Sequence, residues 1–540
     1  MPHDAMWSIP TQNLFEKTGN IPAEEHRTLI QRRVDELKNE ICALNSLHNS
    51  LSPINRLPPE VLSDIIIQGS SQSRKESLLW IRLSHICKHW REVALDCASL
   101  WSDISFQNPT LTSVMLSRTK SAPLTVHIDT SFPQTTPRIN YALSEVFSSG
   151  DRLQSLTVDD RGKKRRLQLR KALSQCTTAP ILEDLRIITR EDNCLNSGFL
   201  KDGAPSLVHL ELSGCIISDW NAQVPLGAGL QILDLSTGLN RTTFRPRPSG
   251  KDFLSSLRKL PLLHTLRLSL FLPNDRYTGH PALLAPIVCR SLRTLDLHDS
   301  SLMISNFLRV VHVPDVQNMK IHTPHHFRTG RPDFTELLTA LHMSWKSLVD
   351  AGVRELRLVR EPLTAFHDVW LEFNGPVGRH HSSETAHTLD LTGLNVQVEA
   401  DTIIHGVSQY WTLEPLQILD IDSILVAEAW ATTLRDLPNL RHITIVGVSM
   451  LNFCNAFDKE QEGAALTQAV PFPALEVIAL EETMLPPELF QKLPKALFYR
   501  SFSPPAFKVV ISHCTGITED SYQLMGNILP HVEVVWEGRG

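Results

Sequence analysis

The sequence predicts an α/β protein, in which an N-terminal helical segment and a small all-α domain precede a long array of parallel strands with helices outside. Two patterns predict this order. Before residue 52, apolar residues recur at steps of four and three, as on one face of a helix. From about residue 150, a Leu-x-x-Leu-x-Leu pattern returns every 23 to 37 residues, which is typical of a repeat architecture.

Charge and cysteine content narrow the classes of function. The 52 basic and 58 acidic residues give a net charge of −6, which argues against a protein that coats nucleic acid or an anionic membrane. The nine cysteines form no C-x-x-C pair, so we expect neither a disulfide framework nor a zinc ribbon. We see no secretory signal and no apolar stretch near the roughly 20 residues that span a bilayer. We therefore expect a cytoplasmic or nuclear protein.

The N-terminal segment has two parts. Residues 1–22 contain three prolines and no sustained periodicity, so we expect a flexible leader. Residues 23–52 predict an amphipathic helix or a short coiled coil, because apolar residues form a three-heptad seam that only His48 interrupts. The seam consists of Ile30, Val34, Leu37, Ile41, Leu44 and Leu51. It indicates either a homodimer that pairs through residues 30–51 or a helix that folds back on the next domain.

Residues 54–106 predict a compact helical domain. The segment from Leu57 to Ile67 begins with two prolines, which a first helical turn tolerates, and continues with apolar residues on one face. A second apolar stripe runs from Leu79 to Cys97, and Leu100 and Trp101 close the unit. About 50 residues bury too little surface for comfortable stability, so we expect a partner helix.

The motif of this domain resembles the F-box. It reads Leu57-Pro58-x-Glu60-Val61-Leu62-x-x-Ile65-Ile66, then Ile86-Cys87-x-x-Trp90-Arg91, then Leu100-Trp101. In that family the motif docks on the Skp adaptor of a cullin-RING ubiquitin ligase. The resemblance implies an adaptor-facing surface of Leu57, Pro58, Val61, Leu62, Ile65 and Ile66, with Ile86, Cys87 and Trp90 packing against it or completing it. The chain departs from the family at Ile66, where an aromatic residue is usual, and in a longer polar connection at residues 69–77.

The array of repeats is expected to span residues 120–540, including a C-terminal cap. Twelve copies of the pattern begin at Leu153, Leu182, Leu207, Leu230, Leu263, Leu292, Val316, Val353, Ala386, Leu416, Leu440 and Leu475. Several copies continue with a small residue and another apolar one, as in Leu212-x-x-Cys215-x-Ile217, and resemble the leucine-rich repeat. The resemblance implies a solenoid of parallel strands with helices outside. We expect residues 509–511 and 532–536 to be strands that close its end.

One position in each copy should point away from the core, because alternate residues of a strand face opposite sides. Nine of these twelve positions are charged, and they are the candidate target-binding residues: Arg186, Glu211, Asp234, Arg267, Asp296, Lys320, Arg357, Asp390 and Asp420. A solvated strand face would be polar as well, so both interpretations stay open. The basic residues Arg267, Lys320 and Arg357 would favour an acidic or phosphorylated target.

No pattern indicates catalysis. Neither His-Glu-x-x-His nor Gly-x-Ser-x-Gly occurs, and the clustered histidines at 322–326 and 380–381 lack a cysteine or acid at ligand spacing. We therefore expect no enzyme activity, no cofactor and no metal. The basic run 161–171 fits either a nuclear import signal or a solvated helix face. Two functions remain: a substrate-recruiting subunit of a Skp-cullin-RING ubiquitin ligase, or a leucine-rich-repeat scaffold or sensor unconnected with ubiquitin.

Overall fold

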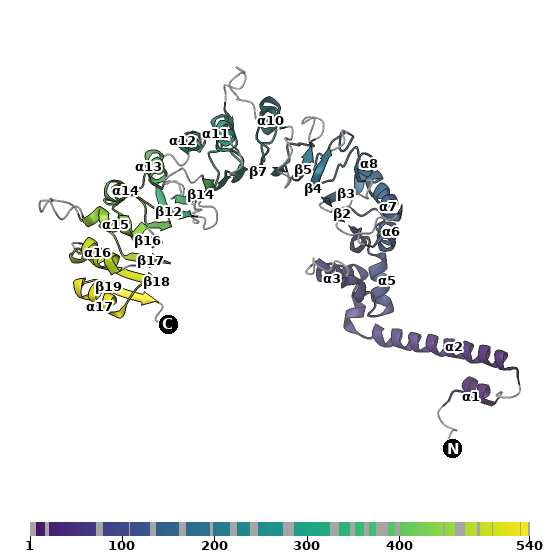
Figure 1. The fold of residues 1–540 in the computed structure, drawn as a ribbon. Helices are drawn as coiled ribbons and strands as arrows, with labels where there is room; N and C mark the ends of the chain where they lie inside the picture. Colours follow the sequence, from purple (N-terminus) through teal and green to yellow (C-terminus); the bar gives the residue numbers. More distant parts are fainter. Residues whose placement is uncertain are drawn as a thin grey trace. The chain divides into compact units, whose positions relative to one another are not determined.

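The computed structural model divides into two compact units, which are described separately below (Figure 1). The first unit contains Met1–His127 and Thr136–Ala142, and the second contains Ile128–Thr135 and Leu143–Gly540. The structure describes residues 7–16, 21–71, 79–106, 108–129, 137–160, 169–194, 198–216, 224–237, 247–273, 286–323, 334–345, 352–360, 367–373, 387–394, 400–422, 424–446, 449–458, 470–482, 487–498, 500–529 and 531–537.

The first unit begins with two helices, α1 (Ile9–Glu16) and α2 (Ala23–Ser50), of which α2 lies where the periodicity predicts a helix. Two glutamates in the first turn of α2 suit the positive end of the helix dipole. The expectation of a flexible leader at residues 1–22 is corrected for residues 9–16, which form α1 and contact α2; residues 1–6 and 17–20 lie outside the described part of the chain. The Leu14 carbonyl oxygen and the His26 ring nitrogen are 2.9 Å apart, and Arg33 donates to Thr11 and Ser8.

A helical domain and a strand pair complete the first unit. The domain contains η1 (Pro53–Arg56), α3 (Pro59–Ser71), α4 (Leu79–Leu83), α5 (Lys88–Asp96) and η2 (Ala98–Trp101). Then follow β1 (Asp103–Ser105), α6 (Pro109–Arg118) and β2 (Leu124–Asp129), and β1 pairs with β2 in parallel. Asn108 caps α6, since its side chain accepts hydrogen bonds from the backbone of Thr110 and Leu111. Helix α7 (Pro137–Ser148) spans the sequence boundary between the units.

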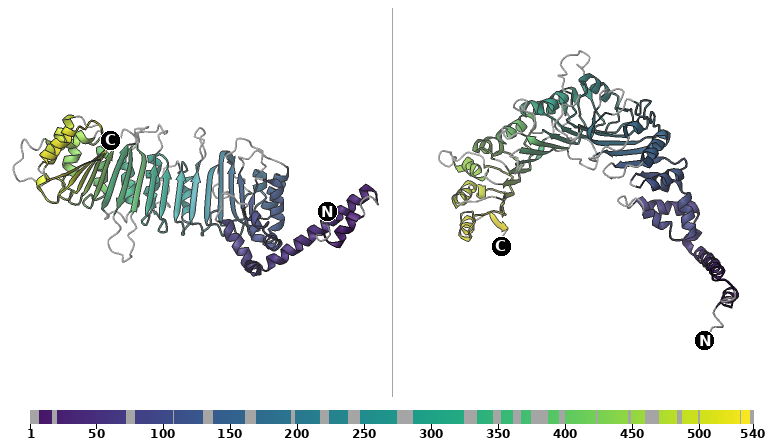
Figure 2. Two further views of the ribbon diagram at one scale, coloured as in Figure 1. Left: turned by 90° about the horizontal axis from the view of Figure 1, so that it is seen from below. Right: turned by 45° about the vertical axis from the view of Figure 1, so that its right-hand side comes forward.

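The second unit is a large, mostly parallel sheet, whose strands run side by side in Figure 2. Its strands are β3 (Leu153–Asp160), β4 (Asp184–Cys194), β5 (His209–Ile216), β6 (Ile232–Ser236), β7 (Thr265–Ser269), β9 (Thr294–His298), β11 (Asn318–His322), β12 (Val353–Arg360), β13 (His367–Phe373), β14 (His387–Leu394), β15 (Ile418–Asp422), β16 (His442–Val446), β17 (Val477–Glu481), β18 (Lys508–Ser512) and β19 (Glu533–Glu537). The short strands β8 (Ile287–Val288) and β10 (Val311–His312) pair with each other.

Helices of the second unit lie along one side of this sheet (Figure 1). They are α8 (Leu169–Leu173), α10 (Gly250–Leu257), α11 (Ser301–Val310), α12 (Phe334–Ser344), α13 (Ala400–Tyr410), α14 (Ala427–Ala429), α15 (Ser449–Asp458), α16 (Pro487–Leu497) and α17 (Glu519–Ile528), with short turns η3 (Gly150–Arg152), η7 (Trp430–Leu434) and η9 (Arg500–Phe502). In the described part of the chain, no helix is long and apolar enough to cross a membrane.

Apolar side chains from strands and helices form the core of the second unit. In β5, Leu210 and Leu212 are buried, as strand alternation requires. Helix α11 contributes Ile304, Phe307 and Leu308, which lie on one face at helical spacing. Each fully buried side chain of this kind contributes about 1.5–3 kcal/mol of burial free energy, so stacked neighbours supply the core that one strand and helix cannot.

The strand order departs from the repeat pattern at one place. The copies that begin at residues 353 and 386 predict two consecutive parallel strands with a helix between them. The structure instead inserts β13 between β12 and β14, antiparallel to both, so that the order is β11-β14-β13-β12-β15. This is a correction with a physical reason. Only six residues separate β12 from β13, which suits a hairpin and is too short for a parallel crossover.

Candidate adaptor-binding and target-binding surfaces

The interior of the helical domain includes residues that the sequence placed on its surface. Leu62 and Ile66 of α3 have no exposed surface, and Trp90 of α5 is almost fully buried. Trp90 donates its indole N–H to Asn55 Oδ1 at 2.8 Å, which fastens α5 to η1. The expectation that Leu62 and Ile66 face a partner is therefore corrected. As an i, i+4 pair they form one stripe, and that stripe points inward.

The neighbouring stripe of α3 is exposed. Val61 and Ile65, also an i, i+4 pair, expose 43% and 40% of their surface, and Ile86 exposes 56%. Pro58 is exposed and Leu57 is half-buried at the start of the same helix. Val61 and Ile65 lie one helical turn apart, so they form an exposed aliphatic pair on α3.

Two further positions define this surface. Cys87, expected to complete it, is half-buried. Ile54 of η1 exposes 41% of its surface and was not predicted from the motif. The signal was present in the sequence, because Ile54 is a large apolar residue just before the Leu-Pro-Pro motif in a turn with no buried residue.

Charged groups hold the C-terminal end of the helical domain to α6 and its following turn. The Lys120 ammonium donates to Asp96 Oδ1 at 2.5 Å, and this hydrogen bond holds the pKa of the Asp96 carboxyl below its usual range. The Arg118 guanidinium lies 4.4 Å from the centre of the Trp101 ring, a cation–π distance. Trp101 donates its indole N–H to the Ala94 carbonyl. These contacts hold η2 against α5 and α6.

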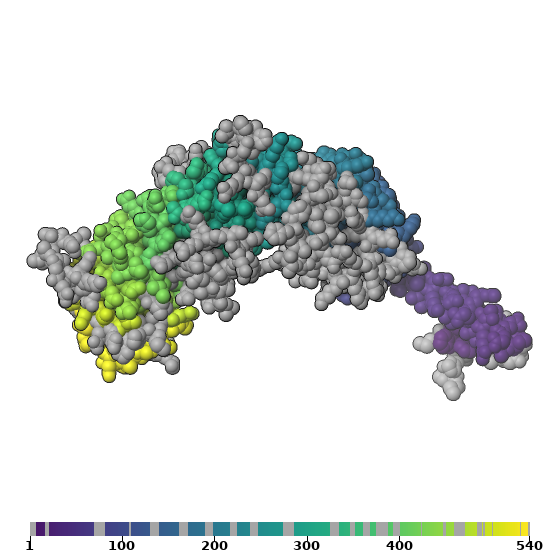
Figure 3. Space-filling view, turned by 45° about the horizontal axis from the view of Figure 1, so that its top comes forward, coloured from purple at the N-terminus to yellow at the C-terminus, as the bar shows by residue number. Residues whose placement is uncertain are grey.

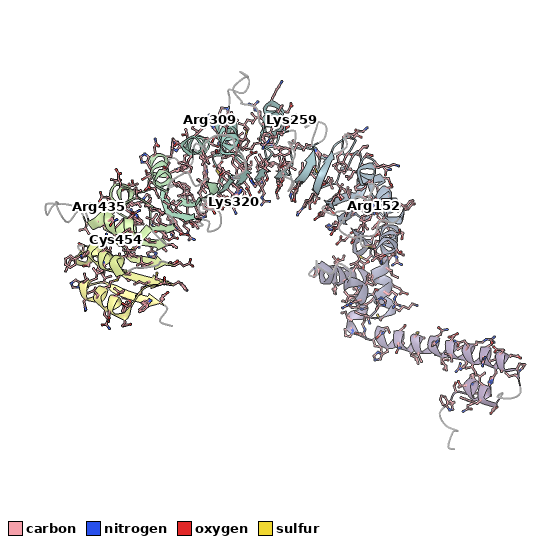
Figure 4. All side chains as sticks on the ribbon, in the orientation of Figure 1. Arg152, Lys259, Arg309, Lys320, Arg435 and Cys454 are labelled. Carbon is pink, nitrogen blue, oxygen red and sulfur yellow. The ribbon has the colours of Figure 1, made fainter. Side chains whose placement is uncertain are left out.

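The nine charged residues expected on the sheet do form one row across it. Register pairs Arg186 with Glu211, and the row continues strand by strand to Asp420. All of these side chains lie between buried apolar neighbours of their own strands. Figure 4 shows Lys320 on the strand side of the second unit, whereas Lys259 and Arg309 lie on the helix side.

Trp370 also lies in this row and was not predicted. Strand β13 places it between Asp390 and Arg357. The Arg357 guanidinium lies 5.0 Å from the centre of its ring, so the indole is held by a cation–π contact. The alternation of Val369, Leu371 and Phe373, all buried, is the sequence signal that could have revealed the strand. Tryptophan and arginine are enriched among residues that dominate protein interfaces.

Acids accompany the basic residues of the row. Arg357 contacts Glu355 at 2.5 Å and Asp420 at 3.3 Å, and Arg267 lies 3.7 Å from Asp234. Lys320 stands by register between Asp296 and Asp390. The three central bases are thus surrounded by carboxylates, so they do not form the free basic patch that an acidic or phosphorylated target would need.

Burial perturbs several carboxyls of this surface. It raises the pKa of Asp296, and it raises the pKa of Asp390, where the charges of Asp368 and Asp296 add to the effect. The pKa of Asp234 is raised by burial and by Glu211. The raised pKa values mean that burial disfavours the ionised form of these three carboxyls, and an added cation would favour it.

A second polar row runs beside the first. Ser269, His298, His322 and Thr392 follow one another on β7, β9, β11 and β14. The His298 and His322 rings meet edge-on with centroids 4.3 Å apart, and His322 Nδ1 lies 2.7 Å from Thr392 Oγ1. In the described residues, no group of three or more His, Cys, Asp or Glu side chains could hold a metal ion.

Comparison with known proteins bears on the helical domain. Residues 54–107 match the F-box-like family model. The matched residues are those that form η1 to η2 and the exposed stripe of α3, so the first unit contains an F-box-like domain. The match covers a tenth of the chain and says nothing of the sheet.

The other comparisons add little. A solved structure titled "Crystal structure of Rad7 and Elc1 complex in yeast" is 12% identical, with 98% of each chain covered and a TM-score of 0.29. A TM-score this low does not establish a shared fold. No curated protein matches the chain.

Proposed function

We propose that the protein is the substrate-recruiting F-box subunit of a Skp-cullin-RING ubiquitin ligase. The observation that carries the proposal is the F-box-like domain at residues 54–107. The exposed aliphatic stripe of that domain supports it, because an F-box protein needs such a surface for its Skp-type adaptor.

The adaptor-binding surface of this proposal is narrower than the motif. It consists of Val61 and Ile65 on α3, Pro58 at the start of that helix, Ile54 of the preceding η1, and Ile86 between α4 and α5. Leu62, Ile66 and Trp90 support that surface from the interior. A partner helix that covers these aliphatic groups would bury the area that a domain of about 50 residues leaves exposed.

The second unit is proposed to be a leucine-rich-repeat array that holds the target. Two features support this assignment: parallel strands carry the Leu-x-x-Leu-x-Leu pattern inward, and helices line one side of the sheet. The opposite strand face carries the charged row and Trp370, which offers both charge patterning and an aromatic anchor for a target protein.

The proposed mechanism is proximity. The chain would hold a target near the ubiquitin-transferring end of the ligase and so raise the local concentration of target lysines. It needs no acid, base, nucleophile or cofactor of its own. The place of action would be the cytoplasm or the nucleus, where such ligases operate.

Capture of a purified Skp-type adaptor by the full-length chain tests the proposal. The wild-type chain should bind, and the double variant Val61→Asp/Ile65→Asp should lose at least 100-fold in affinity, because two carboxylates would be buried against apolar groups. Leu95→Asp is the matched control, since Leu95 is an exposed aliphatic residue of α5 outside the proposed surface. Absence of adaptor binding by the wild-type chain, or equal binding by the double variant, would favour the repeat scaffold or sensor.

A further inference from the structure

The α1–α2 hairpin exposes an unusual amount of apolar surface. No residue of α2 is buried, so the described residues of the helical domain do not cover this helix. The arrangement in which the helix folds back on the next domain is therefore not observed. Ile30 and Val34 expose 44% and 38% of their surface, and Ile41 and Leu44 expose 56% and 66%. The hairpin is drawn in purple in the space-filling view (Figure 3). A helix of 28 residues, about 42 Å long, thus displays an aliphatic seam from Ile30 to Leu44, in which Leu37 alone is half-buried.

We propose that this seam binds a second copy of the chain, with the two α2 helices antiparallel. In the favoured alignment, Val34 lies opposite Leu37 of the second copy, and Ile41 lies opposite Ile30 of the second copy. Each contact occurs twice because the arrangement is two-fold symmetric. Four consecutive layers are then aliphatic on both sides, and every layer places a branched side chain against another apolar residue.

Charge complementarity selects the antiparallel orientation. In that alignment Glu40 lies beside the flank that carries Arg33 of the second copy, whose guanidinium is 11% exposed and contacts Glu36, Thr11 and Ser8 of its own chain. Lys38 lies beside Gln31 of the second copy, and no like-charge pair forms. In a parallel, in-register pair, Arg33 would instead lie beside Lys38 of the second copy, twice. Like charges at these flanking positions oppose pairing, and opposite charges favour it.

The position of α1 supports the same orientation. Helix α1 lies against the flank of α2 that carries His26 and Arg33. On the same side of the C-terminal half of α2, Leu47 is uncovered and exposes 62% of its surface. An antiparallel pair brings α1, with Phe15 63% exposed, beside Leu47 of the second copy. A parallel pair would bring α1 beside Gln31 and Lys38 of the second copy and would leave Leu47 exposed to solvent.

The molar mass of the full-length chain, measured by light scattering across a dilution series, tests the proposal. The expected mass is twice the 60.7 kDa of one chain. Glu40→Lys should weaken dimerisation at least tenfold, because it places like charges together. Glu25→Lys, an equal change of charge at an exposed position on the opposite side of α2, should leave dimerisation unchanged. A monomer at tens of micromolar, or a dimer that Glu40→Lys does not weaken, would overturn the proposal.

Cysteine cross-linking tests the orientation. In a background with the exposed Cys42 replaced by serine, Ile30→Cys/Ile41→Cys should form a disulfide-linked dimer under mild oxidation, and Ile41→Cys alone should not. Cross-linking by Ile41→Cys alone would indicate a parallel pair and refute the antiparallel one. Adaptor capture is measured on the same samples. A monomeric chain that still captures the adaptor overturns only the dimer, and a dimer that captures no adaptor overturns only the proposed function.

Discussion

Truncation of Leu62 and truncation of Val61, which are adjacent residues of α3, should have very different effects on the stability of the helical domain. Leu62 is fully buried, so Leu62→Ala removes packed atoms and leaves a cavity, at a cost of about 2–5 kcal/mol. Val61 exposes 43% of its surface, so Val61→Ala should cost the fold less than about 0.5 kcal/mol. At about 0.05–0.15 kcal/mol per residue, a domain of this size has only about 3–8 kcal/mol of stability. Leu62→Ala therefore removes a large fraction of it, and Val61→Ala removes almost none.

Hydrogen exchange and adaptor binding separate the two effects. In the full-length chain, amide protection of α3 and α5 should fall for Leu62→Ala and stay unchanged for Val61→Ala. Adaptor affinity should fall for Val61→Ala because the contact itself is lost. Saturating adaptor, at about 100 times its dissociation constant, should restore about 2.7 kcal/mol of protection to Leu62→Ala. Unchanged protection in Leu62→Ala, or lost protection in Val61→Ala, would refute the assignment of interior and surface.

Three predictions concern the second unit. Asp299→Ala should cost about 3–5 kcal/mol, measured by amide exchange near β9, since it removes the buried carboxylate that contacts the half-buried Arg247 guanidinium at two points, 2.6 and 3.2 Å; Arg247→Met/Asp299→Leu should recover only part of the loss, because the backbone N–H groups of Leu272 and Ser300 also donate to Asp299. Arg500→Met should cost at least about 3 kcal/mol, because the buried guanidinium donates to four backbone carbonyls, and unchanged exchange in β17 and β18 would contradict this. Burial raises the pKa of Asp296 and Asp390 above the ordinary value of 3.8, so the free energy of unfolding should fall as the pH rises above 3.8. The double variant Asp296→Asn/Asp390→Asn should therefore have a higher urea midpoint than the wild-type chain at pH 7, and the two midpoints should become equal below about pH 4.

Local patterns predicted the strands that carry the repeats. The burial of Leu210 and Leu212 was predictable because strand alternation involves only a few neighbouring residues. The same holds for the strands at 508–512 and 533–537, which lie close to the two closing strands expected there. The start of α3 was also predictable from the sequence, since prolines are favoured in the first turn of a helix. These signals depend only on residues that are close together in the sequence and not on tertiary contacts.

Three features depend on contacts that a sequence pattern does not contain. Residues 9–16 form a helix because α2 supplies partners for Leu14 and Thr11, although eight residues alone are too few for a stable helix. On α3, two adjacent i, i+4 pairs are apolar, and only the packing of α5 decides which pair is interior. The basic run 161–171 falls mainly outside the described residues, so its two interpretations stand as the sequence left them.

The reversed order of β12 and β14 has an electrostatic consequence for the charged row. If the strands had followed the order of the sequence, Arg357 would lie next to Lys320, and Asp390 next to Asp420. Both pairs would place like charges on directly opposite residues, which destabilises strand pairing. In the observed order Lys320 pairs with Asp390, Arg357 pairs with Asp420, and the Trp370 indole separates Asp390 from Arg357. Side chains of this row therefore favour the observed order, in which β14 pairs with β11 and β12 pairs with β15. The inserted strand β13 also places the Trp370 ring beside the Arg357 guanidinium on this row.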